Sequence, residues 1–307
     1  MKTAIEIYKK TFSFVLLKAG VYVGAYALMA VTLGVLIGIF FLLRNVMGGL
    51  AIIIGFLIMI FVLVNVWRFA KRYFLYIVKA GFVSVVATYL TTGSLPEKGS
   101  FQHAKNTVTK HFGTTSIAAG IDLLVEKILK KINGLILKLG GIFSMLPGGK
   151  IILQIITTML TVVIGYIDEA ILGYIFLRKD DEKPWIKAKD GLVLYVKSWK
   201  SILKNASLMA LGIVTIRFVS FIVFYFLFAL VFGGLGNLSV IPAVMLGLIL
   251  TGAISSLFLD PIVTISVLKA YLDNLENAKN TEDGKMVSML NSVPEFNKLE
   301  NGEGLDR

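Results

Sequence analysis

The chain of 307 residues contains no cysteine, which excludes disulfide bonds, thiolate metal sites and a cysteine nucleophile. It has two histidines, His103 and His111, with no acidic neighbour, so we expect no metal site. The sequence also lacks a P-loop, an HExxH motif, a nucleophile elbow and a recognisable grouping of Ser, His and Asp. It therefore predicts a protein that is not an enzyme and that needs no cofactor.

Charge is also scarce. Only 16% of the residues are charged, whereas 56% are hydrophobic and the mean hydropathy is +0.81. An ordinary soluble domain has about 45–50% apolar residues and about 25% charged ones. Apolar runs of about 20 residues or more recur along the chain, which is the length that a membrane helix needs. The sequence predicts an all-α, polytopic membrane protein of the inner or plasma membrane.

The few charges are mostly positive, and the formal net charge is +12. The Lys and Arg residues lie mainly beside the apolar runs, where such side chains anchor helix ends and contact anionic lipid. We therefore expect membrane lipids, above all anionic ones, as partners. We do not expect nucleic acid to bind.

The apolar runs predict about six transmembrane helices. The runs are Gly20 to Leu43, Leu50 to Leu90, Ile151 to Leu177, Leu208 to Leu235 and Ile241 to Tyr271. The second run is about 60 Å long as a helix, twice the hydrocarbon thickness, and Arg68, Lys71 and Arg72 interrupt it midway. It is therefore either two spans that turn tightly there or one long helix whose first half projects beyond the membrane. Lysines before the first run place the N-terminus in the cytoplasm. Two spans separate the basic connector after Leu177 from the C-terminal tail, so the C-terminus lies there too and the number of crossings is even.

Three regions are expected. Residues 1–19 form a basic amphipathic segment, residues 20–275 the transmembrane domain, and residues 276–307 a polar, acidic and disordered tail. Two further stretches, Ile121 to Leu139 and Trp185 to Leu203, have the pattern of amphipathic interfacial helices. The first of them follows a stretch of small residues, so it either packs in the bundle at its start or lies wholly at the interface.

Ionisable residues inside the predicted spans are the candidate site, because such residues usually face the bundle interior. They are Asp168 and Glu169, flanked by Tyr166 and Tyr174, together with Arg217 and Asp260. In one interpretation the acids attract a cation that Tyr166, Tyr174 or Tyr89 covers by cation–π contact, worth up to about 2 kcal/mol. In the other, Arg217 pairs with Asp260 or Asp168 and only fixes helix packing. Pro261 favours a kink beside Asp260.

Four segments resemble, in order, parts of the choline transporter-like family. They are "NVWRFAKRYFLYIVKAGFVSVVATYL", "KHFGTTSIAAG", "AKDGLVLYVKSWKSILKN" and "AISSLFLDPIVTISVLKAYLDNLEN", within about residues 65–277. The segment "KHFGTTSIAAG" is similar to the family's His-x-Gly-Ser segment, and the segment that ends in "LDNLEN" is similar to the family's final helix and acidic exit. The aspartate of that family helix aligns nearer Thr264 than Asp260. The family's first spans and its long extracellular loop have no clear counterpart.

The resemblance implies a transporter or channel for choline or a related small organic cation. Two alternatives stay open. The short six-span core and the basic amphipathic segments also suit a non-transporting scaffold, a homo-oligomer or a subunit of a larger membrane complex. The same amphipathic helices could hold lipid head groups, as in a lipid-handling protein.

Overall fold

A computed structural model describes residues 2–43, 49–70, 74–97, 99–112, 124–131, 134, 165–233, 240–281 and 284–301. All regular structure in these ranges is helical, as the sequence predicts. The elements are α1 (Lys2–Lys10), α2 (Phe12–Leu43), α3 (Gly49–Ala70), α4 (Tyr76–Thr92), α5 (Ser100–Phe112), α8 (Ile167–Leu177), α9 (Pro184–Val231), α10 (Val240–Ile254), the π-helix η4 (Ser255–Leu259), α11 (Asp260–Asp273), α12 (Leu275–Asn280), α13 (Gly284–Asn291) and α14 (Pro294–Asn301).

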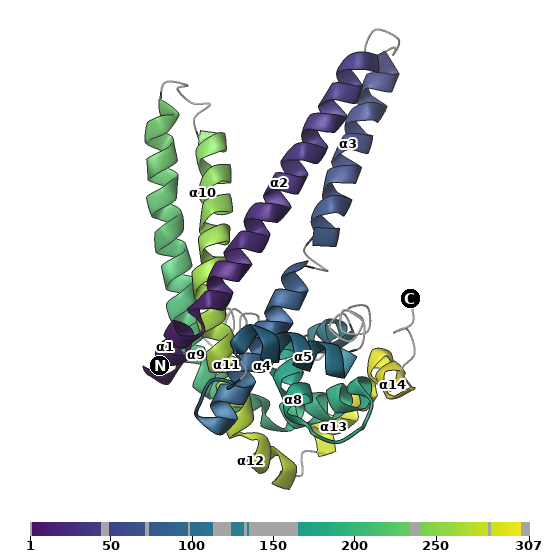
Figure 1. Ribbon diagram of the computed structural model, residues 1–307, viewed down its shortest axis with the longest axis vertical. Coiled ribbons are helices and arrows are strands. Elements are labelled where there is room, and N and C mark those ends of the chain that lie inside the picture. Colours follow the sequence, from purple (N-terminus) through teal and green to yellow (C-terminus); the bar gives the residue numbers. More distant parts are fainter. Residues whose placement is uncertain are drawn as a thin grey trace, which may run out of the picture.

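Two helical hairpins rise from one helical base (Figure 1). Helices α2 and α3 form the first hairpin, and the second half of α9 packs along α10 in the other. The base contains α4, α5, α8, α11 to α14 and the first half of α9. Both hairpins extend from the base in the same direction, and the first and last described helices, α1 and α14, lie at the base.

Three helices in the described part of the chain are long and apolar enough to cross a membrane: Phe12–Ile39, Leu211–Val231 and Ala243–Asp273. Helix α3 is the apolar partner of α2 and has 22 residues. The expected run Ile151 to Leu177 lies largely outside the described residues, and its described part, α8, has 11 residues and is mostly buried in the base. The count of six spans therefore stays a prediction.

The long run from Leu50 to Leu90 divides between the two parts of the molecule. Its first half is α3 in the hairpin, whereas α4 has 17 residues, of which most are buried, and packs against α5 and α8 in the base. The described part of this run matches neither possibility: α4 is not among the helices that pack along α3, and the half that protein covers is the second and not the first. A tightly turned second span would pack along α3.

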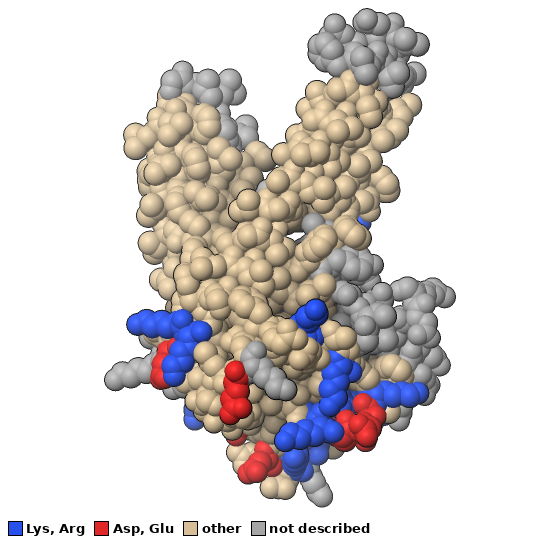
Figure 2. Space-filling view, in the orientation of Figure 1, with Lys and Arg blue, Asp and Glu red and all other residues tan. Residues whose placement is uncertain are grey.

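Charge and exposed apolar surface are separated along the long axis (Figure 2). Lys, Arg, Asp and Glu gather on the base, and the hairpins show almost no charged side chain on this face. On α9 the side chains of Phe218 and Phe226 are exposed, and Leu230 is 84% exposed. Exposed apolar surface of this extent marks contact with a membrane or with another protein.

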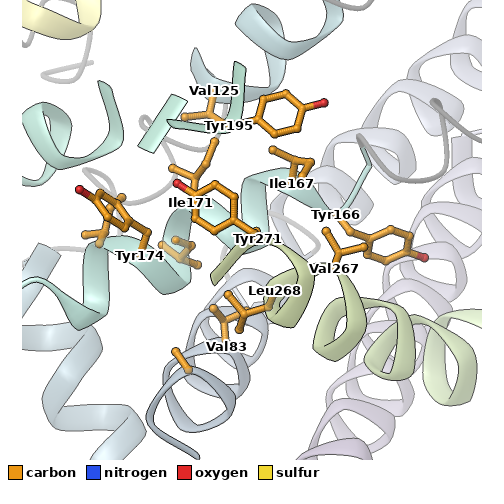
Figure 3. Close-up of a cluster of buried hydrophobic side chains, with 14 of the residues drawn as sticks. Val83, Val125, Tyr166, Ile167, Ile171, Tyr174, Tyr195, Val267, Leu268 and Tyr271 are labelled. Atoms are coloured by element: carbon orange, nitrogen blue, oxygen red, sulfur yellow. The ribbon is translucent and has the colours of Figure 1, made fainter. Parts of the chain in front are cut away.

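Helix α8 lies in the centre of the buried cluster of the base (Figure 3). Ile167, Ile171 and Ile175 recur every four residues and are almost completely buried. Around them the other elements supply Val83 from α4 and Leu268 from α11. The base is therefore a packed hydrophobic core assembled from segments far apart in the sequence.

Gly173 permits the close approach of α8 and α11. A Cβ atom at this position would lie 2.6 Å from Cδ1 of Leu268. We expect Gly173→Val to lower the free energy of unfolding by about 1–3 kcal/mol, because overpacking forces side chains off their rotamers. Thermal unfolding in detergent measures this. Gly24→Val is the control, since nothing lies within 4 Å of a Cβ there; equal shifts in both variants would contradict the prediction.

The N-terminal segment is amphipathic, but its buried side faces protein. Ala4 and Ile7 of α1 are buried, and the helix packs against α11. The opposite side carries the exposed residues Ile5, Lys9 and Lys10. This segment is thus attached to the base beside the start of the first hairpin.

The tail expected to be disordered from residue 276 is instead helical in α12, α13 and α14. The reason is a set of apolar residues at intervals of three, Leu290, Val293, Phe296 and Leu299, all of which are buried. This pattern is short and lies among polar residues, so the polar composition of the tail gives no indication of these helices. Helices α13 and α14 use it to pack against the first half of α9.

Residues 124–131 form an amphipathic helix of the expected kind. Val125 and Ile128 are buried, whereas Lys130 is exposed and pairs with Glu126 at 2.6 Å. Lys131 forms an ion pair with Glu295 of α14, so this helix also attaches to the base. The preceding stretch of small residues lies outside the described residues. The second expected amphipathic helix, Trp185 to Leu203, is part of α9.

Candidate functional site

The chain changes helix type just before Asp260. The Asp260 amide donates a hydrogen bond to the Ser255 carbonyl, five residues back, which makes η4 a π-helix. The equivalent donor for the Ser256 carbonyl would be Pro261, which has no N–H. Lys18 Nζ of α2 donates to this carbonyl at 2.7 Å instead. The kink that Pro261 predicts is therefore a π-turn whose freed carbonyl binds a cationic side chain from the other hairpin.

Arg217, Asp260 and Tyr166 meet beside this π-turn. Arg217 Nη2 lies 2.8 Å from Asp260 Oδ1 and 3.3 Å from the Tyr166 hydroxyl, and the hydroxyl donates to the same carboxylate oxygen at 2.7 Å. Arg217 Nε donates to Ser255 Oγ. These contacts connect α9, η4 and α11 to the start of α8. Of the two pairings expected for Arg217, the structure has the one with Asp260.

The neighbouring acids Asp168 and Glu169 lie in the first turn of α8. Lys79 Nζ of α4 lies 2.6 Å from Asp168 Oδ2 and 3.3 Å from Glu169 Oε1. Thr264 of α11 donates to Glu169 Oε2. Asp168 Oδ1 is buried and has no hydrogen-bond partner within the described residues. Lys18, Lys79, Glu169 and Thr264 also line a cavity of about 30 Å³, which has room for about one water molecule.

We call these ten residues the polar junction: Lys18, Lys79, Tyr166, Asp168, Glu169, Arg217, Ser255, Ser256, Asp260 and Thr264. Its three acids are matched by three cations, so its formal charge is zero. Burial of Glu169 raises the pKa of this carboxyl to about 7, although Lys79 favours its ionised form. When Glu169 is protonated its carboxyl is neutral, and the polar junction then has a net charge of +1.

The polar junction lies where the hairpins join the base. The helix from Val240 to Asp260 is about 30 Å long, and the helix from Arg217 to Val231 is about 21 Å long, at 1.5 Å per residue. A hydrocarbon layer is about 30 Å thick. If the hairpin tips reach one surface of a bilayer, the junction lies near the other surface and not at the midplane.

Two of the predicted aromatic residues lie elsewhere. The ring of Tyr174 has the Arg178 guanidinium 5.8 Å from its centroid, and the ring of Tyr89 has Lys10 Nζ at 4.9 Å. Each ring therefore already carries a cation of the protein. The structure brings together Tyr166, Asp168, Glu169, Arg217 and Asp260 from the predicted set, and it separates Tyr174 and Tyr89 from them.

Sequence reasoning missed five members of the junction: Lys18, Lys79, Ser255, Ser256 and Thr264. Lys79 lies inside an apolar run and could have been found as an ionisable residue in a predicted span. Lys18 belongs to the predicted basic amphipathic segment, residues 1–19, and no feature of the nearby sequence links it to Ser256. Thr264 had one signal, since it aligns nearest to the aspartate of the choline transporter-like family.

Fold and site together define an all-helical protein with three helices that could cross a membrane, within the described residues, and a polar junction at their base. No family model, curated protein or solved structure matches the chain.

Proposed function

We propose that this protein is a transporter for a small organic cation such as choline, embedded in an inner or plasma membrane with both ends of the chain in the cytoplasm. The observation that supports the proposal best is the Arg217–Asp260 pair with Tyr166. Arg217 and Asp260 are ionisable residues that lie where two apolar hairpins meet, and such residues often mark a transport path. The ordered resemblance to the choline transporter-like family supports the same substrate class.

In this proposal the substrate cation competes with Arg217 for Asp260. The pair is only partly shielded, since the side chains of Arg217 and Asp260 are 38% and 23% exposed. A cation that reaches the carboxylate releases the guanidinium, and Tyr166 stays bound to the carboxylate through its hydroxyl. Because Arg217 is on α9 and Asp260 on α11, this exchange alters the contact between two helices. Asp168 and Glu169 form a second acidic position next to it.

The test is uptake of labelled choline into proteoliposomes. We expect saturable uptake by the unmodified protein and a loss of at least tenfold in Asp260→Asn. The matched control is Asp273→Asn on the same helix, because Asp273 is exposed and pairs only with Lys269 one turn away among the contacts described. Unchanged uptake in Asp260→Asn would remove this residue from the path. Uptake no greater than that of empty vesicles would reject choline as the substrate.

The second candidate is a non-transporting scaffold or subunit of a membrane complex. The zero charge of the polar junction favours it, because each acid there already has a cation of the protein as a partner. A scaffold should co-purify from its native membrane with another protein in fixed stoichiometry. Purification of the active chain alone would exclude this candidate.

A further inference from the structure

The two hairpins touch near the base and diverge above it (Figure 1). The contact is polar: the Tyr22 hydroxyl lies 2.7 Å from Ser256 Oγ, and Lys18 Nζ binds the Ser256 carbonyl. We call Lys18, Tyr22 and Ser256 the apex. Beyond it the same helix faces carry exposed apolar residues: Leu33 follows Tyr22 by about three turns on α2, and Ile249 precedes Ser256 by about two turns on α10. The space between the hairpins, which the space-filling view also shows (Figure 2), is therefore a wedge with a polar point and apolar sides.

The depth of the apex fits the head group of a lipid. It adjoins Asp260, which is about 30 Å of helix from the start of α10. That is the thickness of the hydrocarbon layer, so in a bilayer that holds the hairpins the apex lies at the level of the head groups of the base-side leaflet. Acyl chains between α2 and α10 would cover the apolar sides of the wedge.

The charges near the apex match a head group with both signs. Lys18 has three N–H donors, and one described hydrogen bond, to Ser256, uses one of them. Ammonium donors of this kind bind phosphate. Asp260 lies on the turn that follows Ser256 and is partly exposed, so an amine has an acceptor close to the phosphate position. A purely anionic head group has no ammonium to offer this carboxylate, which would keep Arg217 as its partner.

We propose that the wedge binds one phospholipid of the base-side leaflet with a zwitterionic head group, whose phosphate contacts Lys18 and whose amine faces Asp260. The inference rests on the membrane insertion included in the proposed function, but it does not depend on transport. It assigns the lipid to this chain as a specific partner, beyond the general attraction of the basic residues for anionic membranes.

Native mass spectrometry tests the proposal on the full-length protein in nanodiscs with equal amounts of phosphatidylethanolamine and phosphatidylglycerol. We expect one retained phosphatidylethanolamine per chain. Lys18→Gln should reduce this retention at least tenfold, and Lys18→Arg should keep it. Lys9→Gln is the control, because Lys9 is exposed on α1 away from the apex. Unfolding temperatures of the variants show whether a loss of lipid comes from misfolding.

Three outcomes would overturn the inference: no stoichiometric lipid, equal retention of the two lipids, or a dimer without lipid, in which a second copy fills the wedge. Choline uptake is measured on the same variants. Retained lipid without uptake would leave the wedge site standing and reject the transporter proposal. Uptake without retained lipid would support the transporter proposal and reject the wedge site.

Discussion

Replacement of Arg217 by glutamine is expected to lower the free energy of unfolding by about 2–3 kcal/mol, because it leaves a partly buried carboxylate without its cation. Asp260 would keep the Tyr166 hydroxyl at 2.7 Å but lose the guanidinium at 2.8 Å. Ser255 would lose its contact with Arg217 Nε as well. The measurement is chemical denaturation of the protein in detergent micelles or nanodiscs.

The double variant Arg217→Gln/Asp260→Asn distinguishes a broken pair from lost packing. When both charges are absent, most of the loss should be recovered, and the double-mutant cycle gives the coupling free energy. Lys269→Gln is the control, because it breaks an exposed pair with Asp273 and should change stability by less than about 0.5 kcal/mol. If Arg217→Gln behaves like Lys269→Gln, the pair contributes nothing to stability.

The contribution of Glu169 to stability should fall as the pH rises from 5 to 8, while His103 and His111, whose pKa values are lowered by burial, contribute in the opposite direction. Burial raises the pKa of Glu169 to about 7 from 4.5. The folded state therefore holds this proton more tightly than the unfolded state, and the stabilisation is complete below pH 4.5 and lost as the pH passes 7. A shift of this size corresponds to about 3 kcal/mol.

The groups that face Glu169 come from three other elements and from its own helix: Lys79 on α4, Lys18 on α2, Thr264 on α11 and Asp168 beside it on α8. Glu169→Gln should remove the falling contribution in this range while keeping an acceptor for Thr264. Glu126→Gln is the matched control, because Glu126 is exposed. Urea denaturation at several pH values gives the slope for each variant, and a slope in Glu169→Gln equal to that of the unmodified protein would refute the assignment.

The sequence predicts the hairpin helices well because membrane insertion demands long apolar runs, and such runs are visible locally. It predicts less well how the runs are divided. The connector from Trp185 and the span from Leu208 are one helix, α9, because no proline interrupts them. By contrast α4 is apolar like a span but is buried by protein in the base. Hydropathy records that a residue avoids water, and not whether lipid or protein covers it.

The sequence predicts those residues of the candidate site that can be recognised from their immediate neighbours in the chain. Asp260 and Arg217 stand out because a charge within an apolar run is costly unless it is paired. Their actual partners depend on packing between segments far apart in the chain: Lys18 and Ser256 are 238 positions apart. A single sequence holds no local trace of such contacts. The separation of Tyr89 and Tyr174 from the polar junction depends on the same long-range packing.

Helix α9 joins the base and the far tip of the second hairpin without a break. Its 48 residues make a rod about 72 Å long. Its first half is held by the base, and Arg217 lies in the part that leaves the base. If the rod pivots near the polar junction, a tilt of about 5° would move a tip some 21 Å away by about 2 Å. A change in the packing of the base would thus move the far end of the second hairpin, and Arg217 lies close to the pivot point of α9.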